Sequence, residues 1–347
     1  MKDIFKYVVK EENLSKIFKI LVSHPPLDAA KNLVLEIAEQ MNDKDGNFIQ
    51  QFQTTGFYPR LWEIFLFKFF KENGINIIEK YDRPDFHLEK DGVEFFVEAS
   101  LSNEKENDKF SKEYIVEMLD KQDYNAQQEM TDYYVIRMGS VLFSKLNKEY
   151  WKLEWVKNKP IIIAITPAHH YLANFLPDAK VVEYLYGLEY ESEEKPEGLF
   201  LKKINKIEVH KFGEKEIPSN FFAQPNAEHI SAVIFTNNSD LHKFNRMGYQ
   251  LGLTNNEIIM ERAGLAFDET ENSYSKEFTQ SVIPGDFKED WNESVSIFHN
   301  PNAMNPLDRN LFLNVRQVWI EEDGRLGGNI PKFFVFHSKT LPVCIKR

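Results

Sequence analysis

Residues 60–100 read RLWEIFLFKFFKENGINIIEKYDRPDFHLEKDGVEFFVEAS, and this stretch decides which fold the chain can build. Its first part predicts a helix over residues 58–73, because eight of the ten residues from 61 to 70 are apolar and Gly74 is a good helix terminator. So apolar a helix is covered by protein over most of its surface. Glu63 nevertheless shares a stripe with Phe67 and Phe70, where a carboxylate needs a partner or a metal.

A short strand and a β-hairpin are predicted after this helix. The dipeptide Asp91-Gly92 is a strong signal for the tight turn between the two arms. Asp85 follows Pro84 at the start of the first arm, and Glu98 lies late in the second. In that second arm Val93, Phe95, Val97 and Ala99 share one face, whereas Glu94, Phe96, Glu98 and Ser100 share the other. Two carboxylates on adjacent strands, joined by Glu63 from the helix, predict an oxygen-ligand site for Mg²⁺ or Mn²⁺.

These residues resemble the PD-(D/E)XK nuclease superfamily: Glu63 in a first helix, then Pro84-Asp85, then Glu98 late in the next strand. The resemblance is close over residues 58–100 and reaches residue 166 in outline. It implies metal-dependent hydrolysis of nucleic-acid phosphodiester bonds, with DNA as the expected substrate and bacterial restriction or phage defence as the setting. By the same resemblance Asp85 and Glu98 bind the metal, Glu63 binds it or positions water, and the Ala99 carbonyl is a further ligand.

The chain departs from the superfamily pattern at one position. The lysine expected two residues after Glu98 is Ser100, which cannot carry charge. That lysine is understood to orient water and stabilise developing charge, so a substitute must lie within reach of the metal. Lys145 and Arg137, from the following helix, are the candidates. The alternative is a nuclease-like module that has lost catalysis and serves nucleic-acid binding or assembly.

The rest of the chain predicts an α/β protein with a restriction-endonuclease-like mixed sheet flanked by helices. Residues 1–55 are expected to form an N-terminal helical cap, residues 56–170 the nuclease-like core, and residues 171–347 a β-rich elaboration. Within the last segment, residues 229–252 are expected to rejoin the core sheet. Helices are predicted over residues 109–119 and 130–151, and strands over residues 161–166, 230–235, 295–299, 315–320 and 332–337.

Composition narrows the class of partner. The formal charge is −12, so any contact with nucleic acid must come from a local basic patch. His242, Lys243 and Arg246 on a predicted helix, together with Arg137, are the candidate contacts, although a solvated helix face is the alternative. No apolar run is long enough for a membrane span, the N-terminus is charged, and Cys344 is the only cysteine. A cytoplasmic protein without a membrane partner is expected, and homo-oligomers or a partner in a defence complex remain open.

Overall fold

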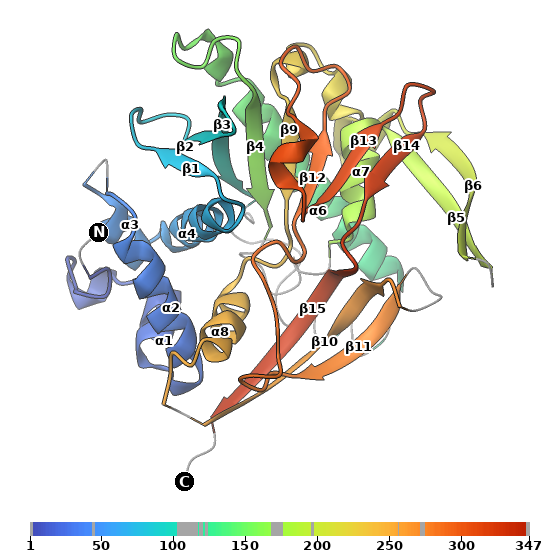
Figure 1. Ribbon diagram of the computed structural model, residues 1–347. Coiled ribbons are helices and arrows are strands. Elements are labelled where there is room, and N and C mark those ends of the chain that lie inside the picture. Colours follow the sequence, from blue (N-terminus) through green and yellow to red (C-terminus); the bar gives the residue numbers. More distant parts are fainter. Residues whose placement is uncertain are drawn as a thin grey trace.

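An eight-stranded mixed sheet is the central feature of the computed structural model, which describes residues 3–43, 46–102, 117, 121, 124–167, 176–195, 198–255, 257–270 and 275–344 (Figure 1). The strand order is β1-β2-β3-β4-β9-β12-β13-β14. These strands are Asn76–Ile78 (β1), Phe86–Lys90 (β2), Val93–Leu101 (β3), Ile161–Thr166 (β4), Ala232–Phe235 (β9), Ser296–His299 (β12), Arg316–Ile320 (β13) and Leu326–Asn329 (β14).

The sheet mixes antiparallel and parallel pairs. Strands β1, β2 and β3 are antiparallel neighbours, and the β2–β3 turn places Asp91 and Gly92 at φ 52° and 79°. Strand β4 runs parallel to β3, and β9 runs parallel to β4. All six residues of β4 are buried, which explains why the first five are apolar, since a central parallel strand is covered on both faces.

Helices cover both faces of the sheet. One face packs against α4 (Phe57–Glu72), and α1 (Lys16–Ser23), α2 (Asp28–Glu39), α3 (Phe48–Gln53) and α8 (Leu241–Gln250) extend the same hydrophobic core. The other face packs against α6 (Tyr124–Leu146) and α7 (Asp178–Tyr186). The alternation along β3 sets the two cores: Phe95 and Val97 belong to the α4 side, and Phe96 to the α6 side.

The prediction of a mixed α/β fold with a sheet flanked by helices is confirmed. The helix expected over residues 58–73 is α4. Apart from residue 117, the helix expected over residues 109–119 lies outside the described residues. Helix α6 begins earlier than predicted and ends at Leu146 instead of residue 151. It stops there because Glu149, at φ 51°, has left the right-handed helical region.

The C-terminal half adds a second sheet beneath the first. Strands β10 (Ile258–Asp268), β11 (Lys276–Ser281) and β15 (Phe333–Cys344) form an antiparallel sheet of order β11-β10-β15 (Figure 1). Two hairpins pair β5 (Leu188–Lys195) with β6 (Gly198–Lys206) and β7 (Val209–Phe212) with β8 (Lys215–Pro218). Within the described ranges, no helix has the length and apolar character needed to cross a membrane.

Candidate functional site

Asp85 and Glu98 face each other at one end of the β2–β3 hairpin. Asp85 directly precedes β2, whose first residue Phe86 pairs with Val97, so Asp85 lies across from Glu98. The Asp85 Oδ2 atom accepts a hydrogen bond of 2.7 Å from the backbone N–H of Ala99. This bond fixes the Asp85 carboxylate against β3. The register of the hairpin therefore places Asp85, just before β2, opposite Glu98, late in β3.

Lys145 reaches Glu98 from the last turn of α6. Its Nζ atom lies 2.5 Å from Glu98 Oε1, and the side chain of Glu98 is only 6% exposed. Glu98 points to the α6 side of the sheet because it shares the face of Phe96. The contact places the Lys145 ammonium beside Glu98. Two residues after Glu98 stands Ser100, where the superfamily pattern has its lysine. The Ser100 hydroxyl itself is buried and has no hydrogen-bond partner among the described residues.

Tyr150 is a member of this site that sequence reasoning missed. It begins a short 3-10 turn, Tyr150–Lys152, just beyond the end of α6, and its hydroxyl hydrogen-bonds to Glu98. Burial, followed by the charge of Glu98, raises the pKa of Tyr150 far above its ordinary value of 10.0. The phenol therefore stays protonated and donates its proton to the Glu98 carboxylate. Arg83 lies close enough for its charge to oppose this shift.

Negative charge is concentrated around Asp85. Burial, then the charges of Glu98 and Glu63, raise the pKa of the Asp85 carboxyl from 3.8 to about 8. The Ala99 N–H and the Lys145 ammonium act in the opposite direction but do not cancel the effect. At neutral pH Asp85 therefore carries a proton in the metal-free protein. A divalent cation beside Asp85 would counteract the burial and the charges of Glu98 and Glu63, lower the Asp85 pKa and displace the proton.

Glu63 approaches Asp85 from the α4 side. Its carboxylate lies 2.7 Å from Arg60 Nη1, one helical turn earlier, and both side chains are less than a fifth exposed. Arg60 is held in turn by Asn47 and Gln51 and stacks on the Phe48 ring at 4.8 Å. The ion pair with Arg60 stabilises the Glu63 carboxylate on the otherwise apolar stripe of α4.

A small polar cleft opens beside Glu63 and Asp85, with a volume of about 80 Å³. Its polar lining consists of Asn42, Asp43, Asn47, Arg60, Glu63, Glu79, Asp82 and Asp85. Pockets for organic ligands generally measure about 300–1,000 Å³. The cleft therefore suits a hydrated ion and a few waters, and is too small for a nucleotide.

Glu63, Asp85 and Glu98 lie close enough for the charges of Glu63 and Glu98 to act on Asp85. They do not by themselves form a complete set of metal ligands. In the part of the chain that the structure describes, no three His, Cys, Asp or Glu side chains are grouped so that they alone could hold an ion. Mg²⁺ commonly uses only one or two carboxylates and keeps several waters. Asp85 and Glu98, with the Glu63 carboxylate near enough for its charge to act on Asp85, fit that requirement.

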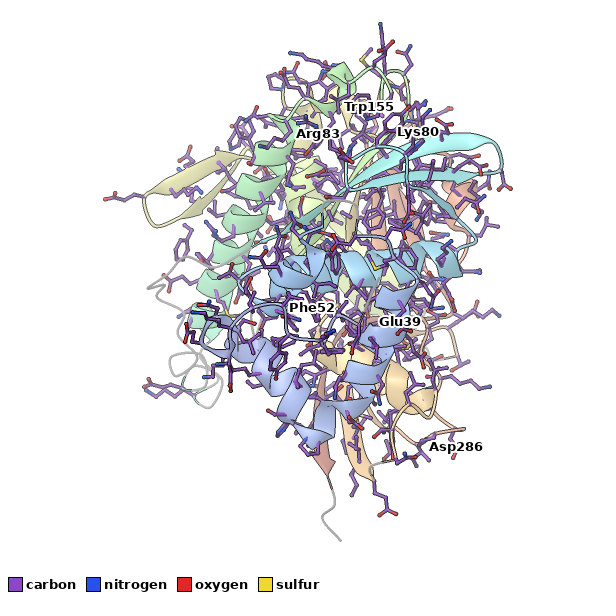
Figure 2. All side chains as sticks on the ribbon, turned by 90° about the vertical axis from the view of Figure 1, so that its left-hand side faces the viewer. Glu39, Phe52, Lys80, Arg83, Trp155 and Asp286 are labelled. Carbon is purple, nitrogen blue, oxygen red and sulfur yellow. The ribbon has the colours of Figure 1, made fainter. Side chains whose placement is uncertain are left out.

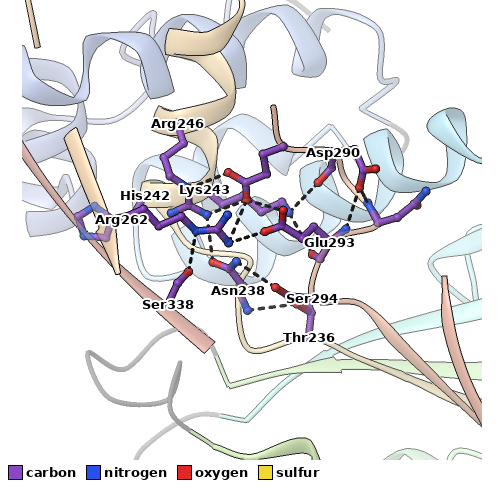
Figure 3. Close-up of polar contacts among 12 residues, drawn as sticks. Thr236, Asn238, His242, Lys243, Arg246, Arg262, Asp290, Glu293, Ser294 and Ser338 are labelled. Carbon is purple, nitrogen blue, oxygen red and sulfur yellow. Dashed lines mark hydrogen bonds and ion pairs between the residues drawn. The ribbon is translucent and has the colours of Figure 1, made fainter. Parts of the chain in front are cut away.

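Two of the three residues of α8 that we expected to contact nucleic acid are buried. Lys243 and Arg246 are 0% and 1% exposed, so they do not form the exposed basic face that we expected from the sequence. Both pair with the buried carboxylate of Glu289, at 3.3 Å and 2.7 Å. Figure 3 shows Lys243 and Arg246 close to Arg262 and Glu293. His242 is partly buried on the same helix. Arg137 is partly exposed on α6 but lies eight residues before Lys145, about 12 Å along the helix axis.

Comparison of the whole chain with protein-family models, with curated proteins and with solved structures finds no match. The geometry around Asp85 and Glu98 therefore has to support any functional conclusion by itself.

Proposed function

We propose that the protein is a Mg²⁺- or Mn²⁺-dependent hydrolase of nucleic-acid phosphodiester bonds, with DNA as the expected substrate. The observation that carries the proposal is the contact of Lys145 with Glu98 directly beside Asp85. Two carboxylates and a lysine are the groups that this chemistry needs, and here the lysine comes from α6 because Ser100 occupies its expected position.

The arrangement of elements supports the same proposal. Helix α4, the antiparallel β1-β2-β3 unit, helix α6 and the parallel strand β4 follow one another in the order expected of a restriction-endonuclease-like core. The carboxylates lie where β2 begins and β3 ends, and helices on opposite faces supply Glu63 and Lys145. Fold alone does not determine activity, so the residues carry the argument.

Each side chain has a distinct proposed role. Asp85 and Glu98 hold the cation, which when bound polarises a phosphate and lowers the pKa of a water. Lys145, whose side chain is 26% exposed, can donate from its remaining N–H groups to a phosphate oxygen, where it stabilises developing negative charge. Tyr150 fixes the orientation of the Glu98 carboxylate. Arg60 keeps Glu63 directed toward the cleft.

The test is a cleavage assay with supercoiled plasmid, linear duplex DNA, single-stranded DNA and RNA, each in Mg²⁺, Mn²⁺ or EDTA. We expect metal-dependent cleavage of at least one substrate and a loss of at least 100-fold in Asp85→Asn and Glu98→Gln. Glu72→Gln, at the exposed end of α4, is the control and should cut normally. Absence of cleavage on every substrate, or full activity in Glu98→Gln, contradicts the proposal. Binding of nucleic acid without cleavage would identify an inactive nuclease-like binding module instead.

A further inference from the structure

A basic and aromatic segment borders the carboxylate site. Residues 145–160 read KLNKEYWKLEWVKNKP and contain five lysines, three aromatic residues and only two glutamates. This composition is the reverse of the whole chain, whose formal charge is −12. The segment begins with Lys145 and includes Tyr150, so its first residues contact Glu98. It is therefore a local basic surface located at the proposed site of cleavage.

The segment is held against the loop that leads into Asp85. The Trp155 indole stacks on the Tyr81 ring at 4.8 Å with an interplanar angle of 9°. Its Nε1–H donates a hydrogen bond of 2.9 Å to the backbone oxygen of Arg83, two residues before Asp85. Figure 2 shows Lys80, Arg83 and Trp155 together at the upper end of the molecule. Two segments separated by about seventy residues therefore form one surface.

The rings continue inward as a stacked series. Tyr81 lies 5.4 Å from His87, and His87 stacks on Phe96 at 4.5 Å. Phe96 belongs to the core between β3 and α6, whereas Trp155 is partly exposed. Among the ring contacts of the described residues, Trp155 is the outer member of the series. A flat ring arriving from solvent can extend the series by stacking on it.

Four cations of these two segments form no ion pair with a carboxylate of the described residues. Lys80, Arg83, Lys148 and Lys157 are exposed, and none of the carboxylates in the described ranges forms an ion pair with them. In contrast, Lys152 pairs with Glu149, and Lys159 with Glu94. Asp82 and Glu154 are also exposed on these two segments, so the four cations outnumber two available carboxylates beside a partly exposed indole. Phosphates and unpaired bases are the groups that such a surface binds.

We propose that Lys80, Arg83, Lys148, Trp155 and Lys157 bind a single-stranded segment of the nucleic-acid substrate. An unpaired base stacks on Trp155, and the flanking phosphates contact Arg83, Lys148 and Lys157 on the way to Asp85. A base within a duplex is already stacked on both faces, so the surface favours an unpaired nucleotide. The inference rests on the proposed function, because it takes Asp85 and Glu98 as the site to which the strand is delivered.

The test is a fluorescence-anisotropy titration in EDTA, so that binding is measured without cleavage. The probes are a labelled 20-nucleotide DNA strand and the duplex of the same sequence. We expect the single strand to bind at least tenfold more tightly. Trp155→Ala should weaken single-strand binding by about 5- to 100-fold, which is the loss of one base–aromatic stack. Trp155→Phe keeps a ring and should retain most of the affinity, which also covers the case that Trp155→Ala is misfolded.

Salt dependence tests the phosphate contacts. The double variant Lys148→Gln/Lys157→Gln should lower the slope of log K against log salt by about 1.4, or about 0.7 for each lost phosphate contact. The matched control is Lys16→Gln/Lys19→Gln on α1, where two exposed lysines are removed far along the chain and the slope should stay unchanged.

Equal affinity for strand and duplex, or unchanged single-strand binding in a folded Trp155→Ala, overturns the inference. A protein that binds single strands through Trp155 but cleaves nothing overturns the proposed function alone. A protein that cleaves in Mg²⁺ while Trp155→Ala binds and cleaves normally overturns this inference alone.

Discussion

Asp85→Asn should stabilise the metal-free protein at alkaline pH, although it removes a residue of the proposed active site. The variant keeps an oxygen to accept the Ala99 N–H, and its amide N–H₂ can donate to Glu98 in place of the charge repulsion. Carboxylates that bind a metal ion lie close together, so they repel one another when the ion is absent. Removing one of them therefore stabilises the metal-free protein while it weakens metal binding.

The sign and size of the effect follow from the Asp85 pKa. A carboxyl whose pKa rises from 3.8 to about 8 on folding holds its proton more tightly in the folded state. Its contribution to stability is complete below pH 3.8 and is lost as the pH rises through about 8. The full shift corresponds to about 6 kcal/mol. Rotation of the carboxylate and entry of water screen much of that cost, so we expect about 2–3 kcal/mol at pH 8 or above.

Urea denaturation in EDTA at pH 4 and at pH 8.5 measures this difference. Wild type and Asp85→Asn should have similar free energies of unfolding at pH 4, and the variant should be more stable at pH 8.5. Asp82→Asn, three residues earlier and exposed, is the matched control and should change little at either pH. An Asp85→Asn protein that is equally or less stable than wild type at pH 8.5 would refute the reasoning.

Three further predictions test other parts of the structure. Lys145→Ala should reduce cleavage by about 100- to 1,000-fold in steady-state kinetics, as loss of one stabilising donor does, whereas full activity would remove Lys145 from the site. Glu289→Gln should cost about 3–5 kcal/mol in urea denaturation, because it leaves Arg246 and other buried cations without their anion; an unchanged midpoint would contradict this. Gly248→Ala should cost about 1–3 kcal/mol, because the added methyl would lie 2.3 Å from the Ala29 backbone oxygen, and wild-type stability would show that α2 and α8 can separate.

Much of the sheet was predictable because its signals are local. Five consecutive apolar residues, from 161 to 165, predict β4, and the alternation along β3 assigns Phe95 and Phe96 to opposite cores. Lys145 could be named as a candidate because helical spacing puts it at the border of an apolar face. Its contact with Glu98, however, depends on how α6 crosses the sheet, which no local pattern specifies.

The errors and omissions also have physical reasons. Lys243 and Arg246 carry charges that are typical of an exposed helix, and only the tertiary structure brings Glu289 to them; it lies 43 residues after Arg246. Tyr150 lies in a short turn after a helix, where the spacing of apolar residues does not indicate which way a side chain points. The aromatic series ending at Trp155 joins two distant segments, so sequence alone shows the rings but not their stacking.

Calorimetric titration with Mn²⁺ near pH 7 tests most directly whether Asp85 and Glu98 hold a divalent cation. We predict one binding event that releases about one proton, read from buffers of different ionisation enthalpy, since the Asp85 pKa of about 8 leaves this carboxyl protonated before the metal binds. Glu98→Gln should weaken this binding at least tenfold, while Glu72→Gln should bind as wild type does. Absence of Mn²⁺ binding in the wild type, or equal binding by Glu98→Gln, would contradict a metal site at this hairpin.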